Sequence, residues 1–284
     1  MTLKVDLNKS AANLRVCLEK AGMITPPEVE VCFDLDVSGS YEGLHRDGTT
    51  NALMTRLVPW GLVFDPDRQL DVCTFSDGPS HVHHVGMVNA DNYHGFVGRE
   101  ILDKVPGWNG ATDFAPVLRK NLEIFGWTPS EEDVGPTKGP WARVKSGLGL
   151  GTKTASTASK RRKSLVLFNT DGENNDRDAT ERLFDEMQKR KYGMYVLFIA
   201  VGRSHFDSLR RLSNEYSNVG LCVIEDIKEW VGQNDDEINE ELITPKLVEW
   251  LGHEDPKEDP KEDDENDAIK AAALATAGSA FMRR

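Results

Sequence analysis

One carboxylate and two hydroxyls recur at alternate positions near the start of the chain, in the pattern Asp36-x-Ser38-x-Ser40. The pattern directly follows residues 29–35, a dense apolar run typical of a buried strand. At this spacing, all three oxygen-bearing side chains can point into one small volume. Hard oxygen ligands suit Mg²⁺, Mn²⁺ or Ca²⁺, so the pattern indicates a cation site. Alone it is a weak signal, because many serine-rich turns match it by chance.

Two further oxygen donors stand at comparable positions in the sequence. Thr112 lies in a glycine-containing loop, residues 109–113, that opens a predicted helix. Asp171 lies in the turn that closes the apolar run 164–168. Ligands of open α/β sheets bind at the carboxyl ends of the strands. We therefore expect both donors to converge with the first group at one edge of a sheet.

Neighbouring side chains are predicted to support the ion ligands or to contact a partner. Asp34 lies two residues before the first carboxylate and so on the same strand face. It is either an auxiliary ligand or, as we favour, a partly exposed acid or one paired with Lys or Arg. Asp113 and Glu173 either assist the ion or add negative charge at helix N-termini. Tyr41 is a predicted partner contact, and Trp108 is either a partner contact or ordinary packing.

Other potential metal ligands are predicted to have no such role. The histidines on one short strand favour an exposed polar edge, because no third ligand stands at a fixed spacing. The cysteines show no CxxC spacing and lie mostly in apolar runs, which favours small core residues in a reduced protein. These residues are His81, His83 and His84, and Cys17, Cys32, Cys73 and Cys222.

Periodicity predicts the elements that must position the candidate ligands. Strands are expected at 29–35, 70–75, 81–88, 164–169, 194–201 and 219–224, and helices at 50–64, 92–105, 113–125, 176–191, 206–216 and 239–251. Most strands are continuous apolar runs, which indicates a parallel sheet buried on both faces. The short 77–80 turn makes the third strand antiparallel. We expect a doubly wound, mostly parallel six-stranded α/β sheet with one antiparallel edge strand and helices on both faces.

The pattern divides the chain into a domain at 25–251, an N-terminal extension at 1–24 and a tail at 252–284. The domain is interrupted at 127–163 by an insertion with eight basic and three acidic residues. The insertion is either a solvated flexible loop or a contact arm for an acidic partner or nucleic acid. The tail combines an acidic linker with an alanine-rich end, which is either a docking peptide or a frayed terminus.

Composition narrows the function classes. The 284 residues carry a net charge of −13, so general binding to nucleic acid or anionic membrane is not expected. No apolar stretch approaches the roughly 20 residues needed to span a bilayer. The first ten residues lack the apolar region of a secretory signal, so a cytoplasmic location is expected.

Residues 25–251 resemble a von Willebrand factor A domain, in which a metal-ion-dependent adhesion site is built from three separate turns. The matching residues are Asp36, Ser38, Ser40, Thr112 and Asp171. The segments LDVCTFS and GATDFAPVL are most similar to the bacterial tellurium-resistance-type subgroup, with a further likeness to copine A domains. Tyr41 departs from the family pattern, which more often has Met or another apolar residue there.

The resemblance implies that Ser38, Ser40 and Thr112 bind the ion through their hydroxyls, while Asp36 and Asp171 bind it directly or through water. It also implies an open position for a carboxylate from a partner protein. Mg²⁺ is the first choice because it favours six oxygens and keeps waters, and Ca²⁺ or Mn²⁺ is the alternative.

We therefore expect a non-enzymatic, metal-dependent interaction module, in a stress-response system of the tellurium-resistance type. One alternative is a structural or assembly subunit of a larger particle, such as a phage-like one. Another is a metal-dependent phosphohydrolase. The sequence lacks GxxxxGK[ST], GxSxG and HExxH, which disfavours an enzyme.

Overall fold

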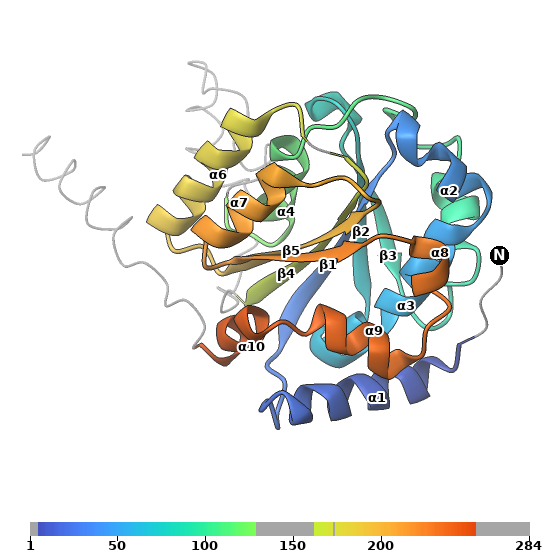
Figure 1. Cartoon of the computed structure of the whole chain (residues 1–284), viewed down its shortest axis with the longest axis vertical. Coiled ribbons are helices and arrows are strands. Elements are labelled where there is room, and N and C mark those ends of the chain that lie inside the picture. The colour runs from blue at the N-terminus through green and yellow to red at the C-terminus, as the bar shows by residue number, and fades with distance from the viewer. Residues whose placement is uncertain (1–4, 129–161, 173, 254–284) are drawn as a thin grey trace, which may run out of the picture.

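A computed structural model describes residues 5–128, 162–172 and 174–253. Its centre is one six-stranded sheet with the strand order β3-β2-β1-β4-β5-β6 (Figure 1). The strands are β1 (Val29–Asp36), β2 (Leu70–Phe75), β3 (His83–Val88), β4 (Lys163–Thr170), β5 (Met194–Val201) and β6 (Val219–Ile224). All neighbours are parallel except β2 and β3, which are antiparallel. The predicted fold class is confirmed.

Helices cover both faces of the sheet (Figure 1). They are α1 (Leu7–Lys20), α2 (Glu42–Arg46), α3 (Thr49–Phe64), α4 (Ala115–Ile124), α6 (Arg177–Lys189), α7 (Asp207–Glu215), α8 (Ile227–Trp230), α9 (Asp235–Leu242) and α10 (Pro245–Gly252). Residues of α4, α6 and α7 form one hydrophobic core with the sheet, and residues of α1, α3, α8, α9 and α10 form the other. Because β4 and β5 are buried along their whole length, their sequences are continuous apolar runs.

Several predicted elements differ from the observed ones for local reasons. The predicted helix 239–251 is two helices, because Thr244 caps α10 and Pro245 begins it. The predicted helix 92–105 is reduced to the short π-helix η3 (Val97–Ile101). The third strand begins at His83 because the preceding residues form the 3-10 turn η2 (Pro79–His81).

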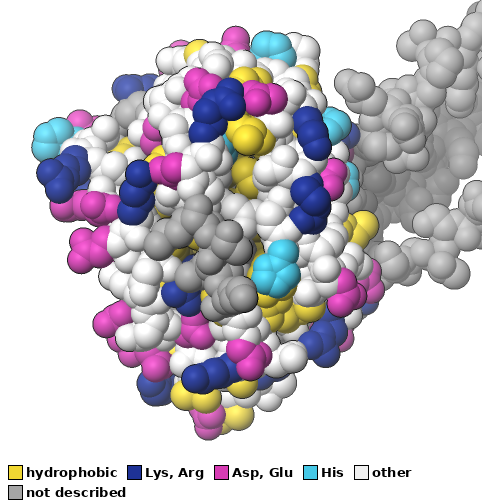
Figure 2. Space-filling model, turned by 90° about the vertical axis from the view of Figure 1, so that its right-hand side faces the viewer, with side chains coloured by type: hydrophobic (Ala, Val, Ile, Leu, Met, Phe, Trp, Pro, Cys, Tyr) yellow, Lys and Arg dark blue, Asp and Glu magenta, His cyan; other side chains and the backbone are white. Residues whose placement is uncertain are grey.

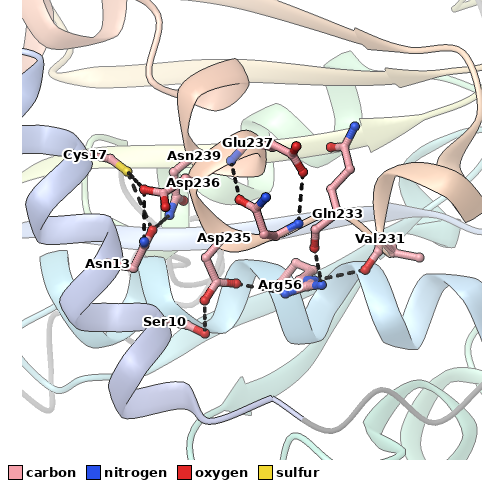
Figure 3. Close-up of polar contacts among 11 residues, drawn as sticks. Ser10, Asn13, Cys17, Arg56, Val231, Gln233, Asp235, Asp236, Glu237 and Asn239 are labelled. Carbon is pink, nitrogen blue, oxygen red and sulfur yellow. Dashed lines mark hydrogen bonds and ion pairs between the residues drawn. The ribbon is translucent and has the colours of Figure 1, made fainter.

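Helix α1 lies within the first 24 residues and packs into the core through Leu14 and Leu18. Polar contacts tie it to the segment around α9 (Figure 3). Ser10 Oγ donates to Asp235 Oδ2 at 2.7 Å, and Asp235 Oδ1 also pairs with Arg56 of α3 at 2.8 Å. The Arg56 guanidinium further donates to backbone carbonyls of the 231–233 turn. One partly buried network therefore joins α1, α3 and α9.

The ends of the predicted insertion 127–163 pack on the domain. Trp127 is buried, and its Nε1 donates to Ser164 Oγ at 3.0 Å. Lys163 is the first residue of β4, and its Nζ donates to the carbonyls of Trp250 and Leu251 at 3.0 Å. Assigning these residues to a solvated loop was wrong, since their side chains fill the core edge. Residues 129–161 of the insertion and 254–284 of the tail lie outside the described residues.

Within the part of the chain that the structure describes, no helix combines the length and apolar composition needed to cross a bilayer.

Candidate functional site

The site is built at the carboxyl end of β1, the central strand next to β4 (Figure 1). Asp36 ends the strand and is fully buried. Its Oδ1 accepts a hydrogen bond from Ser38 N at 2.8 Å, and its Oδ2 accepts one from Thr170 Oγ1 at 2.7 Å. These hydrogen bonds hold the Asp36 carboxylate in a fixed position at the end of β1.

The two serines of the motif extend from Asp36 toward the end of β4. Ser38 Oγ and Ser40 Oγ are 3.2 Å apart, and Ser40 Oγ donates to Asp171 Oδ1 at 2.8 Å. Asp171 follows β4 directly. The first and last acids of the predicted ligand set are thus joined through the serine pair, across 131 positions of sequence between Ser40 and Asp171.

Thr112 lies beside the Asp171 turn. Its Oγ1 is 3.9 Å from the point that a Cβ on Gly172 would occupy. Its carbonyl oxygen accepts a hydrogen bond from Asn175 N at 2.8 Å. The loop before it is fastened to the end of β1, because Gly39 N donates to Gly110 O at 3.1 Å. The structure therefore brings all three predicted turns to one edge of the sheet.

Two glycines allow the Thr112 loop to approach the turn after β2. A Cβ on Gly110 would lie 2.1 Å from Asp77 Oδ1, and one on Gly107 would lie 2.2 Å from Ser76 Oγ. The same Asp77 oxygen accepts a hydrogen bond from Ala111 N at 3.1 Å. Gly107 also has a φ of 75°, a conformation that favours glycine. The loop position depends on these close backbone approaches.

Burial raises the pKa of Asp36 to about 6 and raises the pKa of Asp171 above its usual value. In the described part of the chain, neither carboxylate has an ion pair with Lys or Arg. A bound cation would offset this desolvated negative charge. The donors are carboxylate and hydroxyl oxygens, a set that fits Mg²⁺, Mn²⁺ or Ca²⁺.

His45 of α2 contacts the backbone carbonyl of Asp36, a role that sequence patterns did not reveal. Its Nε2 lies 2.9 Å from Asp36 O, and its Nδ1 lies 3.0 Å from Thr50 Oγ1. Burial lowers the pKa of this imidazole to about 4, so it is neutral at physiological pH. The ring also packs on Tyr41 and Trp108 at centroid distances of 5.3 and 5.1 Å. Helix α2 therefore positions the backbone of the first ligand.

The prediction that Tyr41 contacts a partner was wrong. Tyr41 is fully buried, and its hydroxyl donates to Asn169 Oδ1 at 2.7 Å. An aromatic residue with one polar end fits this position because Asn169 supplies an acceptor inside the core. Trp108 is partly buried, with the Arg46 guanidinium 5.9 Å from its ring centroid. It packs against His45, and a partner contact through it remains a prediction.

Asp34 lies deeper on the same strand face and is fully buried. Its Oδ2 accepts from Asn121 Nδ2 at 2.6 Å, and its Oδ1 accepts from Cys32 Sγ at 3.4 Å. The favoured prediction, exposure or pairing with Lys or Arg, was wrong, because α4 covers this part of β1 and supplies an amide instead. Desolvation raises the pKa of Asp34 to about 8.

The structure gives the other acidic residues near the site different surroundings. Asp113 Oδ2 accepts from Gly78 N at 2.9 Å, so it stabilises the turn after β2. Glu173 lies outside the described residues. Asp176 bridges the loop before α6 and the start of α4. It accepts from Phe114 N at 3.0 Å and Ala115 N at 2.9 Å, at the start of α4.

Two histidines at the sheet edge, His81 of η2 and His84 of β3, pair with nearby acids. His84 Nε2 lies 2.8 Å from Asp71 Oδ1, and His81 Nδ1 lies 3.3 Å from Asp77 Oδ1. Among the described residues, they are not part of any group of three potential metal ligands.

No protein-family model matches the chain. An uncharacterized Bacillus subtilis protein, YcbR, is 28% identical over 123 residues, which cover 43% of this chain and 48% of that protein. The chain thus spans about half the length of this curated relative.

Solved structures with a similar fold include von Willebrand factor type A from Catenulispora acidiphila. It is 13% identical with a TM-score of 0.46, over 76% of this chain and 42% of that one. Proximal thread matrix protein 1 from the mussel byssus, with a zinc-occupied MIDAS motif, is 16% identical with a TM-score of 0.43. That match covers 76% of this chain and 48% of that one. Both TM-scores lie below 0.5, so these structures are partial resemblances.

Proposed function

We propose that this chain is a metal-dependent protein-interaction module whose ion is held by Asp36, Ser38, Ser40, Thr112 and Asp171. The observation that carries the proposal is the 2.8 Å hydrogen bond between Ser40 and Asp171, which joins the first and last ligand turns. The Thr112 loop is bonded to the loop after Asp171 through Asn175 N, so each of the three turns would contribute oxygen donors. This arrangement suits one hard divalent cation.

Magnesium is the proposed ion, with Ca²⁺ or Mn²⁺ as the alternative. When bound, the ion supplies a Lewis-acidic position that accepts a carboxylate oxygen from another protein. The serine and threonine hydroxyls would hold it without adding charge. Asp36 and Asp171 would balance part of its charge. An ion with few anionic ligands retains affinity for an additional acid.

Two observations favour binding over catalysis. The buried histidine at the site, His45, has both ring nitrogens occupied and a pKa lowered to about 4, so it is not a free general base. The sequence also lacks the common nucleotide-binding and hydrolytic motifs. We therefore expect no turnover of phosphoesters, and metal-dependent hydrolysis that disappears in Asp36→Ala would establish the enzyme alternative.

The surface supports a polar mode of partner contact. In Figure 2, Lys and Arg side chains are interspersed with Asp and Glu over the described part of the visible face. Among the described residues, the exposed large hydrophobics are Val16 and Ile24 near the N-terminus and Met87 on β3. Contact through one ion and a partner carboxylate does not need a broad apolar patch.

The sequence resemblance supports a proposal about the cellular system in which the module acts. The segments that flank the ligands resemble the tellurium-resistance-type subgroup, so we place the module in a cytoplasmic stress-response system of that type. The basic insertion at 127–163 would contact an acidic surface of a partner, in addition to the contact through the ion. The alternative is an assembly subunit of a larger particle, which would be retained in a high-mass fraction whether or not the ion is present.

Affinity capture tests this function. Immobilised wild-type chain is exposed to extract of its source cells in Mg²⁺ or in EDTA, beside Ser40→Ala and the exposed control Ser80→Ala. We expect one partner that is held by wild type and Ser80→Ala only in Mg²⁺, and that is lost after amidation of its carboxylates. A partner that survives EDTA and Ser40→Ala would contradict an ion-mediated contact.

A further inference from the structure

A second group of potential metal ligands lies beneath the site at Asp36. Cys32 and Asp34 share one face of β1, and Cys73 stands on β2, where the strand register pairs it with Asp34. All three side chains are fully buried, as is Asn121 of α4, which covers them. Adjacent strands and one helix therefore enclose two thiols, a carboxylate and an amide.

The distances within this group match those expected around a tetrahedral ion. Cys32 Sγ lies 3.4 Å from Asp34 Oδ1 and 3.6 Å from Asn121 Oδ1. Zinc binds sulfur at about 2.3 Å and oxygen at about 2.0–2.2 Å, so neighbouring S and O ligands stand roughly 3.5 Å apart. The ligand atoms of Cys32, Asp34 and Cys73 all lie within 4.8 Å of one another. An ion would draw the Cys73 thiolate slightly inward.

The orientation of Asn121 and Asp34 leaves one oxygen of each side chain available as a metal ligand. Asn121 Nδ2 donates to Asp34 Oδ2 at 2.6 Å, so these two atoms are paired with each other. Asp34 Oδ1 and Asn121 Oδ1 both face Cys32 Sγ. The pairing fixes both side chains and presents two oxygens and a sulfur to one point. A hydrogen bond of this kind normally orients a metal ligand.

Charge gives a further reason for a cation. Within the described ranges, Asp34 has no ion pair with Lys or Arg, and the side chains that donate hydrogen bonds to it, Asn121 and Cys32, are uncharged. A buried carboxylate without a cation is costly. Thiolate ligands select zinc over magnesium, because sulfur is a soft ligand and magnesium requires hard oxygen donors.

We propose that Cys32, Asp34 and Cys73 form a zinc site, with Asn121 Oδ1 as the fourth ligand. Binding releases the two thiol protons and leaves two thiolates and one carboxylate on Zn²⁺. This site is separate from the oxygen-only site at Asp36 and does not depend on the proposed function. It differs from the sequence-based prediction that these cysteines are inert core residues. Because α4 encloses the site, zinc would enter during folding, before α4 packs.

X-ray absorption spectroscopy on the full chain tests the proposal directly. The chain is refolded with zinc and dialysed against EDTA, which strips exposed ions. We expect about one zinc per chain by elemental analysis and two sulfur scatterers at about 2.3 Å. A chain that retains no zinc, or zinc with only oxygen and nitrogen neighbours, would overturn the proposal. The readout uses wild type, so it does not depend on whether a variant folds.

Substitutions then assign the ligands. Cys32→Ser and Cys73→Ser should each lose the bound zinc, whereas Asp36→Ala and the buried control Cys222→Ser should keep it. Retention of sulfur-bound zinc in the double variant Cys32→Ser/Cys73→Ser would overturn the assignment. So would a Cys32–Cys73 disulfide found by mass spectrometry in chain refolded with zinc under argon.

Discussion

The backbone N–H of Asn175 donates a hydrogen bond to the carbonyl oxygen of Thr112 at 2.8 Å. This contact joins the loop before α4 to the loop before α6, each of which contributes a proposed ion ligand. Neither loop belongs to a strand or helix at that point. The relative position of Thr112 and Asp171 therefore depends on contacts between the two loops. Substitution of the side chains that make these contacts tests this dependence.

Asp176 links the two loops through hydrogen bonds of its side chain. Its carboxylate accepts hydrogen bonds from two N–H groups at the start of α4 and one from Thr180 Oγ1 at 3.1 Å. We expect Asp176→Ala to lower the free energy of unfolding by about 1–3 kcal/mol, because charged hydrogen bonds to a helix start are lost. Mg²⁺ binding should also weaken. Urea unfolding and calorimetry on Asp176→Ala and on the exposed control Asp178→Ala measure both effects. Equal values for the two variants would exclude this role.

Gly110 permits the close approach of the Thr112 loop to the turn after β2. A Cβ there would meet Asp77 Oδ1 at 2.1 Å and Ser76 Oγ at 2.7 Å. We expect Gly110→Ala to displace the loop and weaken Mg²⁺ binding at least tenfold while most of the fold is retained.

Gly43 in α2 is the matched control for this experiment, since a Cβ there would have no neighbour within 4 Å. Gly43→Ala should leave ion binding unchanged and stabilise the helix by up to about 1 kcal/mol. Unchanged Mg²⁺ affinity in Gly110→Ala would show that the loop position does not control the site.

Lys163 holds helix α10 in place. Its buried ammonium donates to the carbonyls of Trp250 and Leu251 and lies 5.1 Å from the centroid of the Trp250 ring. We expect Lys163→Met to destabilise the chain by about 2–4 kcal/mol, because the α10 carbonyls lose a charged donor. Thermal unfolding and hydrogen exchange in α10 provide the measurement. The exposed control Lys189→Met should have little effect, and a similar loss in both variants would contradict the assignment.

Asp34 should make stability depend on pH in the metal-free chain. Burial raises its pKa to about 8, whereas an unfolded Asp titrates near 3.9. Between these values the native state holds a proton that the unfolded state has released, so this group's contribution to stability falls as pH rises from about 4 to 8. The slope is at most about 1.4 kcal/mol per pH unit.

Asp34→Asn removes this titration. Urea unfolding in EDTA at several pH values should show a flatter pH dependence than wild type between pH 4 and 8. The exposed control Asp178→Asn should retain the wild-type slope. Equal slopes in Asp34→Asn and wild type would show that Asp34 is ionised in the native state throughout this range.

The sheet could be predicted well because its strands are buried on both faces. The bounds predicted for β2, β5 and β6 agree with the structure residue for residue. Local features that interrupt periodicity were harder to predict. The Thr244 cap and Pro245 divide one predicted helix into two. The position of α1 depends on the Arg56 network, whose members are far apart in the sequence and give no periodic signal.

The candidate ion site could be predicted where its residues form short motifs at strand ends. Its supporting residues could not, because they depend on tertiary contacts. His45 reaches the Asp36 carbonyl only when α2 folds back over β1. Cys32 and Cys73 approach each other through strand register, a relation that the spacing of cysteines does not reveal. Tyr41 was assigned to the surface because the pattern could not show that Asn169 would supply a buried acceptor.

The central claim, one ion shared by three turns, is tested most directly by calorimetric titration of the zinc-refolded chain with Mg²⁺. Wild type and the exposed control Ser80→Ala should bind about one Mg²⁺ per chain with equal affinity. Ser40→Ala and Asp171→Asn should each bind at least tenfold more weakly while keeping the wild-type fold by circular dichroism. Wild type that binds no Mg²⁺, Mn²⁺ or Ca²⁺, or variants that bind as tightly as wild type, would contradict the account.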